Sequence, residues 1–268
     1  MDNRPIGFFD SGLGGLTCMP YLMRELPEEK IIYFGDTART PYGSKATDTI
    51  RKFSIQIADF LVENDVKMIV IACNTVSAVA LFDIRERFPN IPVIGIIKPA
   101  AEKVIQACSA ENRIGIIGTK ATILSGVYDQ LIKGQNSELN VFSMACPAFV
   151  PLIEEGILNN EIMDLTIKHY LNDFLLENRI DTVVLGCTHY PLIRENIERL
   201  YPGIKIIDPS QEIISTIKDV LAERGLGAKD STFGSTFYAS DLSENFTNMI
   251  DRIFENTEVS IQFKNLEF

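Results

Sequence analysis

Short runs of apolar and β-branched residues alternate along this chain with longer segments in which apolar residues recur at helical spacing. The two patterns differ because a buried strand needs only a few consecutive apolar residues, whereas an amphipathic helix shows them every three or four positions. The apolar runs predict strands at Ile6–Phe9, Ile31–Phe34, Met68–Ala72, Val93–Ile97, Ile114–Ile117, Val141–Met144, Thr182–Leu185, Ile204–Ile207 and Thr236–Tyr238. The segments between them predict helices near Leu16–Glu25, Ala46–Val62, Val76–Arg87, Ala121–Lys133, Glu161–Glu177, Gln211–Glu223 and Glu244–Glu255.

The predicted strands are continuously apolar rather than alternating, which is typical of a parallel sheet covered on both faces. Strands that alternate with helices indicate a doubly wound α/β fold. The pattern restarts near Ile114, and in each half the third strand ends with a cysteine, Cys73 or Cys187. Ligands of open α/β sheets bind at the carboxyl ends of the strands. The sequence therefore predicts an α/β protein of two similar doubly wound parallel-sheet lobes, with the active site between them.

Two proline-containing segments look like the points where the chain passes between the lobes. Lys98–Pro99 follows the fourth predicted strand, and Asp208–Ser210 follows the eighth. The predicted division is therefore residues 1–97 plus 210–268 for the first lobe and residues 98–209 for the second.

The charge balance and the absence of a long apolar segment narrow the possible partners. The 268 residues include 36 Asp and Glu against 25 Lys and Arg, a net charge of −11, whereas a nucleic-acid surface is basic. No apolar run approaches the length of a membrane span, and the first residues contain no apolar signal segment. We expect a cytoplasmic protein that binds neither nucleic acid nor a membrane, although a local pocket can still take an anionic small molecule.

The five cysteines are widely spaced, and none belongs to a CxxC pair. This argues against a disulfide framework, a zinc ribbon and a thioredoxin-like redox site. Cys18, Cys108 and Cys146 read as small buried hydrophobic side chains. Cys73 and Cys187 differ, because each stands between an apolar strand and a polar turn, where the N–H groups of the next helix favour the thiolate. A thiol with an ordinary pKa of about 8.5 can act there as an acid or a base.

Two loops are candidates for binding carboxylates. The glycine-rich turn after the first strand lacks the dinucleotide-binding fingerprint, because Thr17 stands where that motif needs glycine, and it is no P-loop. It is either a tight turn or a nest of N–H groups for a carboxylate, with Asp10 at the pocket edge. The loop before the second predicted helix either caps that helix through Ser44 or Thr47 or offers N–H groups beside Tyr42 to a second carboxylate.

Glu154 and His189 are further candidates for proton transfer. Glu154, expected near the start of a helix, is either a solvated side chain or a carboxylate that assists catalysis. His189 follows Cys187 by two residues and either assists the thiol or is structural. A zinc site of Cys73, Cys187, Asp10 and His189 has no compact ligand pair to support it, so no metal is expected.

Taken together, these strings resemble the bacterial glutamate racemases over nearly the whole chain. The matching segments are Phe9–Gly15, Pro41–Gly43, Ala72–Thr75, Cys146–Pro147, Phe149–Leu152 and Gly186–Pro191. The resemblance implies two α/β lobes and a cofactor-independent interconversion of L- and D-glutamate that supplies D-glutamate for peptidoglycan. We also expect a homodimer. One departure is Lys98, where the family often has Glu, and it lies outside the catalytic strings.

The same resemblance implies roles for particular residues. Cys73 would take the α-proton from D-glutamate and Cys187 from L-glutamate, with Asp10, Glu154 and His189 assisting catalysis. The residues that would bind the substrate are Asp10, Ser11, Pro41, Tyr42, Gly43, Asn74, Thr75, Thr188 and His189. Three alternatives stay open: an aspartate racemase with the same thiol pair, a two-lobed binding protein with inert cysteines, and a thiol–disulfide oxidoreductase.

Overall fold

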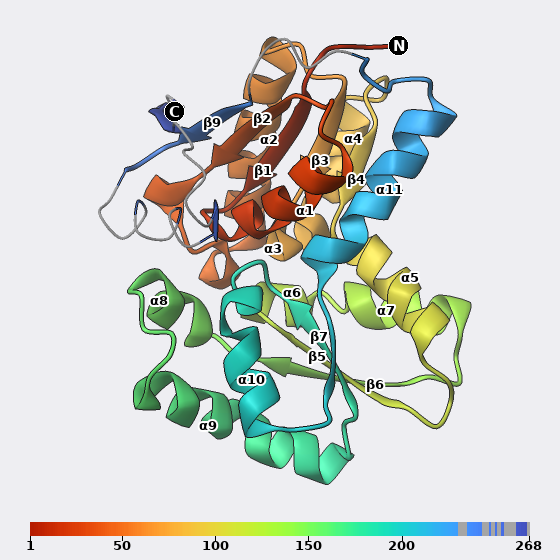
Figure 1. Ribbon diagram of the computed structural model, residues 1–268, viewed down its shortest axis with the longest axis vertical. Coiled ribbons are helices and arrows are strands. Elements are labelled where there is room, and N and C mark those ends of the chain that lie inside the picture. Colours follow the sequence, from red (N-terminus) through yellow and green to blue (C-terminus); the bar gives the residue numbers. More distant parts are fainter. Residues whose placement is uncertain (230–234, 243–246, 248–249, 251–252, 255–260, 267–268) are drawn as a thin grey trace.

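Two parallel β-sheets, one above the other in Figure 1, organise the computed structural model. The residues that it describes are 1–229, 235–242, 247, 250, 253–254 and 261–266. All described strand pairs are parallel, as the continuously apolar runs predicted.

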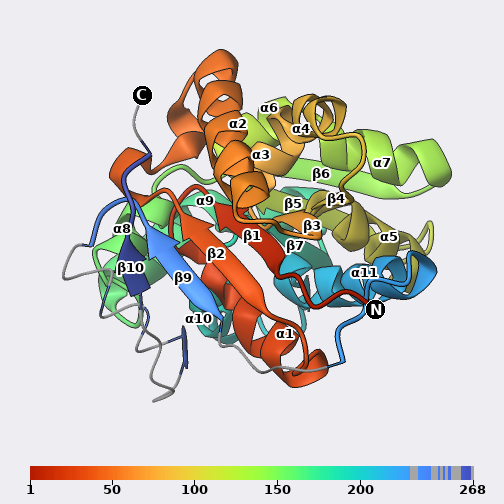
Figure 2. The same ribbon diagram turned by 90° about the horizontal axis from the view of Figure 1, so that it is seen from above.

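The upper sheet has the strand order β10-β9-β2-β1-β3-β4 within the described residues. Its strands are β1 Ile6–Asp10, β2 Ile31–Gly35, β3 Met68–Ile71, β4 Val93–Gly95, β9 Thr236–Ala239 and β10 Ile261–Phe263. Strand β10 was not predicted. Consecutive residues along a strand of this sheet point to opposite faces. Phe8 and Val70 pack in one apolar cluster, and Phe9 and Ile71 pack in the other. Both faces of the sheet are therefore covered, and Figure 2 shows α2 and α4 on one face and α1 and α11 on the other.

The lower sheet repeats the central part of the upper one. Its strands are β5 Arg113–Gly118, β6 Asn140–Ala145, β7 Thr182–Gly186 and β8 Lys205–Ile207. Their order β6-β5-β7-β8 is that of β2-β1-β3-β4, so β5 corresponds to β1 and β7 to β3. The predicted fold class, two similar doubly wound α/β lobes, is confirmed.

Helices connect the strands in both lobes. The described helices are α1 Met19–Glu25, α2 Thr47–Glu63, α3 Asn74–Val79, α4 Leu81–Arg87, α5 Ile97–Ala107, α6 Lys120–Leu124, α7 Val127–Gln135, α8 Phe149–Glu154, α9 Glu161–Asn178, α10 Arg194–Leu200 and α11 Pro209–Glu223. Short 3-10 helices cover Gly14–Cys18, Thr37–Arg39, Tyr42–Ser44 and Tyr190–Ile193. Most of the predicted helix Glu244–Glu255 lies outside the described residues.

Two helices predicted as continuous are each divided in two. The first is broken at Ala80, whose φ of −126° and ψ of −2° are not helical. The second is broken at Gly126, which has a φ of +66°, a conformation that glycine adopts without steric cost. The apolar spacing continues across both breaks, and periodicity therefore could not reveal them.

Helices α5, α8 and α10 were not predicted. Pro99 made the start of α5 read as a crossing, but it lies in the first turn of that helix, where the N–H that proline lacks has no intrahelical partner. Lys98 is mostly exposed on the same helix and pairs with Glu102 at 3.5 Å. Helix α5 packs against α7 and α11, so three helices meet where the two lobes join.

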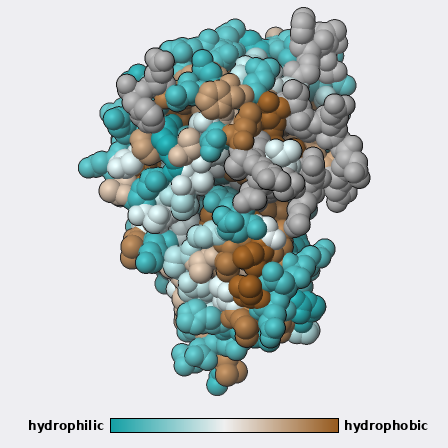
Figure 3. Space-filling view, turned by 90° about the vertical axis from the view of Figure 1, so that its left-hand side faces the viewer, coloured by the Kyte–Doolittle hydropathy of each residue, from teal (hydrophilic) through white to brown (hydrophobic). Residues whose placement is uncertain are grey.

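The surface seen in Figure 3 is mostly hydrophilic, with apolar patches on both lobes. Among the described residues, the exposed large apolar side chains include Ile162 and Leu165 of α9. Within that part of the chain, no helix combines the length and apolar character needed to cross a membrane.

Candidate active site

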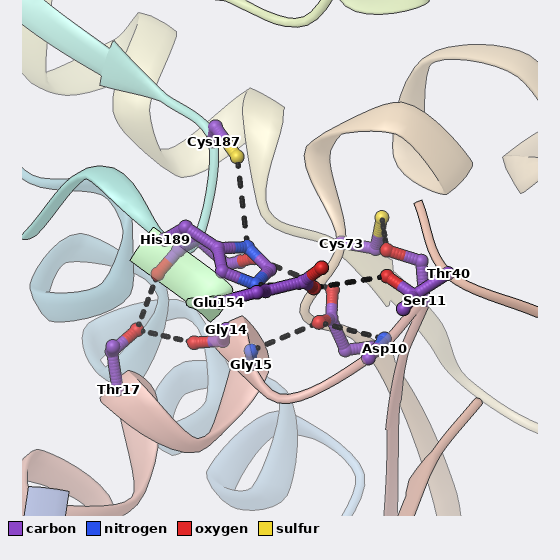
Figure 4. A network of polar contacts seen from close by, with 12 residues as sticks. Asp10, Ser11, Gly14, Gly15, Thr17, Thr40, Cys73, Glu154, Cys187 and His189 are labelled. Carbon is purple, nitrogen blue, oxygen red and sulfur yellow. Dashed lines mark hydrogen bonds and ion pairs between the residues drawn. The ribbon is translucent and has the colours of Figure 1, made fainter. Parts of the chain in front are cut away.

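Polar segments follow the strands of both sheets at their carboxyl ends. Asp10 is the last residue of β1, Cys73 lies between β3 and α3, and Cys187 follows β7. Because β3 and β7 hold equivalent places in their sheets, the two cysteines stand at equivalent strand ends of the two lobes. Figure 4 shows the polar side chains that gather around them.

A cavity between these strand ends is lined by both cysteines. It contains about 20 Å³ of free space, and a buried water needs roughly 10–15 Å³, so the closed site has room for about one water molecule. The predicted site residues that line it are Ser11, Pro41, Tyr42, Gly43, Cys73, Asn74, Thr75, Cys187, Thr188 and His189. Two larger cavities, of about 530 and 540 Å³, are lined by neither cysteine, so size alone does not identify the site.

Cys187, His189 and Glu154 form a chain of polar contacts (Figure 4). Cys187 Sγ lies 3.9 Å from His189 Nδ1, and His189 Nε2 lies 3.2 Å from Glu154 Oε1. Thr40 Oγ1 donates to the same Glu154 oxygen at 3.1 Å. Glu154 is the last residue of α8, so the expectation that it lies near the start of a helix was wrong. The Glu154 carboxylate therefore contacts the imidazole that lies beside the Cys187 sulfur.

The surroundings of His189 favour its protonated form. Burial lowers the pKa of His189, but the hydrogen bonds and charges of Cys187 and Glu154 outweigh burial and raise this pKa well above its ordinary value of 6.5. Burial also raises the pKa of Glu154, but the hydrogen bond and charge of His189 lower it further, so the net shift is downward. A protonated imidazole donates from both ring nitrogens, which satisfies Glu154 and Cys187 together.

Replacing Glu154 by glutamine is expected to destabilise the protein most at mildly acidic pH. His189 has a folded-state pKa above its unfolded value, so its contribution to stability is complete below about pH 6.5 and is lost as pH rises through the raised pKa. Without the carboxylate, protonating the buried ring costs more. The free energy of unfolding should fall by about 1–2 kcal/mol near pH 5.5. The loss should shrink as the pH rises through the raised pKa of His189. Urea denaturation at a series of pH values from about 5.5 upward measures it.

Glu155→Gln is the matched control for this prediction. Glu155 is the next residue along the chain and is exposed, so its replacement removes the same charge without touching His189. Its unfolding free energy should track that of the original protein at every pH. An equal, pH-independent loss in both variants would contradict the ion-pair explanation.

Cys73 has surroundings of the opposite character. Burial, followed by the charge of Asp10, raises the pKa of the Cys73 thiol, although the hydrogen bond with Ser11 works against this rise. The thiol donates to Ser11 Oγ at 3.4 Å. The sequence suggested that the N–H groups beyond Cys73 favour a thiolate, whereas in this closed structure burial dominates and Cys73 keeps its proton.

Asp10 lies behind the site rather than at its edge. It is fully buried and is not among the residues that line the cavity. Gly12 N and Gly15 N donate to Asp10 Oδ2 at 3.2 and 3.1 Å, and Thr188 Oγ1 donates to Oδ1 at 3.4 Å. The expectation of Asp10 at the pocket edge was wrong, because a buried carboxylate needs donors of its own and takes those of the glycine-rich turn.

Tyr42 belongs to the apolar core as much as to the cavity lining. Its ring is almost completely buried, and its hydroxyl donates to Asp36 Oδ2.

Helix α2 begins after Ala46, and neither Ser44 nor Thr47 caps it through a side-chain hydrogen bond. The interpretation of Ser44 or Thr47 as the cap of this helix was therefore wrong.

The cavity lining also includes residues that the sequence did not single out. These residues are Thr40, Thr119 and Val150. Thr119 Oγ1 lies 2.9 Å from Thr75 Oγ1, so it joins the two lobes at the site. The similarity of the two halves could have revealed Thr119, because it follows β5 as Ser11 follows β1.

The other three cysteines lie outside the cavity lining. All five are free thiols, with Cys18 and Cys146 buried and Cys108 partly buried. Among the described residues, no three His, Cys, Asp or Glu side chains gather in a group that could hold a metal ion. The reactive side chains at the site are the thiols of Cys73 and Cys187, the imidazole of His189 and the carboxylate of Glu154 that contacts it.

Comparison with known proteins gives consistent matches across the chain. The family described as Asp/Glu/Hydantoin racemase matches residues 18–217. A glutamate racemase of Neisseria meningitidis serogroup C is 44% identical over 264 residues, 98% of this chain and 97% of that protein. Another, from Sulfurihydrogenibium sp., is 47% identical over 217 residues, 81% of this chain and 82% of that protein. The crystal structure of glutamate racemase from Francisella tularensis in complex with D-glutamate has a TM-score of 0.92 and 40% identity, and covers 100% of this chain and 99% of that chain.

Proposed function

This chain belongs to the Asp/Glu/hydantoin racemase family and is an amino-acid racemase, and on that premise we propose that it interconverts L- and D-glutamate by proton transfer at Cys187 and Cys73. The observation that carries the proposal is that two free cysteines, one from each lobe, line the same closed cavity. The glutamate racemase relatives described above support glutamate as the substrate.

Racemisation removes the α-proton from one face of the substrate and returns a proton to the other. A single base would have to move around the substrate between these steps, whereas two groups on facing lobes reach both faces without moving. Each positioned acid or base of this kind raises the reaction rate by about 10²- to 10⁴-fold. Correct placement of the reacting groups contributes further.

The charges around the two sulfurs assign them different starting roles. His189, whose pKa is raised well above its ordinary value, lies beside Cys187 and can donate a hydrogen bond from Nδ1 to the Cys187 sulfur. Burial and Asp10 keep Cys73 protonated. Cys187 thiolate then takes the α-proton of L-glutamate while Cys73 thiol gives its proton to the opposite face, leaving Cys187 as the thiol and Cys73 as the thiolate. D-glutamate reacts with this second form in reverse.

The lobes must separate to admit the substrate, because the cavity of about 20 Å³ is far smaller than an amino acid. Opening would break contacts between the lobes, including Thr40–Glu154 and Thr75–Thr119. Closing would then surround the substrate with hydroxyl and amide donors and exclude water, conditions under which fixed dipoles stabilise a developing carbanion most strongly.

The proposed lobes are residues 1–97 plus 210–268 and residues 98–209. Strand β4 ends just before the first boundary, and helix α11 begins at the second. The four strands of the lower sheet all lie between them in the sequence, which supports this division. The supply of D-glutamate for peptidoglycan, the homodimer and the cytoplasmic location rest on the resemblance and the sequence, and they stay predictions.

Isotope exchange in heavy water tests the proposal directly. With L-glutamate and no added cofactor, the circular dichroism signal should decay to zero. In early turnovers the D-glutamate formed should carry deuterium at Cα, and the recovered L-glutamate should carry little, because the proton is returned from the other face. The measurement is mass spectrometry of the separated enantiomers.

Two results would count against the proposal. Equal early deuteration of both enantiomers would indicate a single base in exchange with solvent. Turnover of L-aspartate as fast as that of L-glutamate would contradict the substrate assignment.

A further inference from the structure

Asn74 presents an amide that is satisfied at one end only. It is the first residue of α3, is 2% exposed and lines the cavity. Its Oδ1 accepts a hydrogen bond from Tyr128 Oη at 2.7 Å. Its Nδ2 is buried and has no hydrogen-bond partner among the described residues. An unpaired buried donor costs about 1–3 kcal/mol, so Nδ2 is a donor available to an acceptor in the cavity.

Tyr128 determines which end of the amide is available. Its phenol is almost completely buried, and burial raises its pKa, so the hydroxyl keeps its hydrogen and must donate it. The acceptor is Asn74 Oδ1. If the amide rotated by half a turn, Nδ2 and Oδ1 would exchange places and Tyr128 would lose this acceptor. The phenol hydrogen therefore selects the orientation in which the NH₂ group is left for a ligand.

Tyr128 and Asn74 come from different lobes. Tyr128 lies on α7, between the lower-sheet strands β5 and β6, whereas Asn74 follows β3 of the upper sheet and is the neighbour of Cys73. The hydrogen bond between them therefore exists when the lobes are closed. An open site leaves the amide free to rotate, and closing restores one orientation.

We propose that Tyr128 is a positioning residue that orients the Asn74 amide so that Nδ2 donates to a carboxylate of the substrate as the lobes close. This inference rests on the proposed racemisation of glutamate. It gives Tyr128, which does not line the cavity, a role in substrate binding. The ligand class that fits a lone N–H donor beside the catalytic thiol is a carboxylate, since an acceptor with negative charge forms the stronger hydrogen bond.

Tyr128→Phe tests the proposal because it removes one oxygen and keeps the ring. KM for glutamate should rise by about 5- to 50-fold, the range expected for a hydrogen bond to a charged group. The kcat should change by less than about 3-fold, since the sulfur atoms keep their places. Steady-state kinetics in both directions of the reaction give these values.

Tyr201→Phe is the matched control. Tyr201 Oη also donates to an asparagine Oδ1, that of Asn172 at 2.6 Å, but this pair lies outside the cavity lining. Loss of a tyrosine–asparagine hydrogen bond there should leave KM and kcat unchanged. Urea denaturation of both variants shows whether either loss of stability accompanies a kinetic effect.

A double-mutant cycle separates positioning from a general loss of packing. If Tyr128 acts through Asn74, adding Tyr128→Phe to Asn74→Ala should change KM by less than about 2-fold. Asn74→Asp offers Tyr128 an acceptor but turns an oxygen toward the cavity, so KM should rise at least as much as in Tyr128→Phe. This variant also keeps the proposal testable if Tyr128→Phe does not fold.

The outcomes distinguish this inference from the function on which it rests. An unchanged KM in Tyr128→Phe or in Asn74→Asp, or effects that multiply in the double variant, would overturn the role of Tyr128. Absence of glutamate racemisation in the unmodified protein would overturn the proposed function instead.

Discussion

Cys187→Ala and Cys73→Ala are each expected to lower the rate of glutamate racemisation by about 10²- to 10⁴-fold or more. Each variant lacks the group that exchanges a proton with one face of the substrate, so neither direction of the reaction can be completed. Both sulfurs are small and nearly buried, and the thermal unfolding midpoint should change little. The measurement is the change in circular dichroism with L-glutamate and with D-glutamate as starting material.

Cys108→Ala is the control for these variants. Cys108 follows α5, is partly buried and lies outside the cavity lining, so its loss should leave the rate within about 2-fold of the original. A near-normal rate in Cys187→Ala with a fold shown to be intact would refute the two-base mechanism.

Gly14→Ala is the second substitution for which a large effect is expected. A Cβ on Gly14 would lie 2.4 Å from Thr188 Oγ1 and 2.6 Å from His189 Nδ1, closer than atoms can approach. The imidazole cannot simply turn away, because it is buried and bonded to Glu154. Relief requires a shift of His189 or of the lobes. A misplacement of about 1 Å at a reacting centre costs about 10²-fold in rate, so kcat should fall by about that factor.

Gly134→Ala makes the same chemical change where there is room. Gly134 is exposed in α7, and nothing lies within 4 Å of an added Cβ. Alanine there should raise the free energy of unfolding by about 0.4–1 kcal/mol and leave kcat unchanged. Overpacking at Gly14 should instead cost about 1–3 kcal/mol. A normal kcat in Gly14→Ala would mean that the lobes need not approach this closely at His189 for catalysis.

Most of the described strands could be predicted, because burial on both faces of a sheet leaves a run of consecutive apolar residues, whereas β10 was not predicted. Phe8 and Phe9 are adjacent and both apolar, and they pack into different cores. The sequence pattern predicts the boundaries of the helices less well. The start of α5 was not predicted, because Pro99 was interpreted as part of a crossing between the lobes. The breaks at Ala80 and Gly126 were not predicted, because the apolar spacing continues through them. Periodicity reports which face is buried but not whether the backbone stays helical along it.

The position of the cysteines could also be predicted, since the end of a parallel strand is a topological place that any doubly wound sheet provides. The partners of each residue could not. Asp10 was expected at the pocket edge and is buried behind it, held by the glycine-rich turn. A role for Tyr128 was not predicted, because no residue near it in the sequence indicates that it donates to Asn74 of the other lobe.

Apolar pattern and strand-end motifs were thus sufficient for the α/β lobes, the pair of thiols and the family resemblance, because these depend on residues that are close together along the chain. The unlike surroundings of the two sulfurs became evident in the folded molecule. Burial and the charge of Asp10 raise the pKa of the Cys73 thiol, while Cys187 lies beside His189, which in turn contacts Glu154. Such effects depend on distances of a few ångströms between segments far apart in sequence, and electrostatic interactions fall off with that distance and grow with burial.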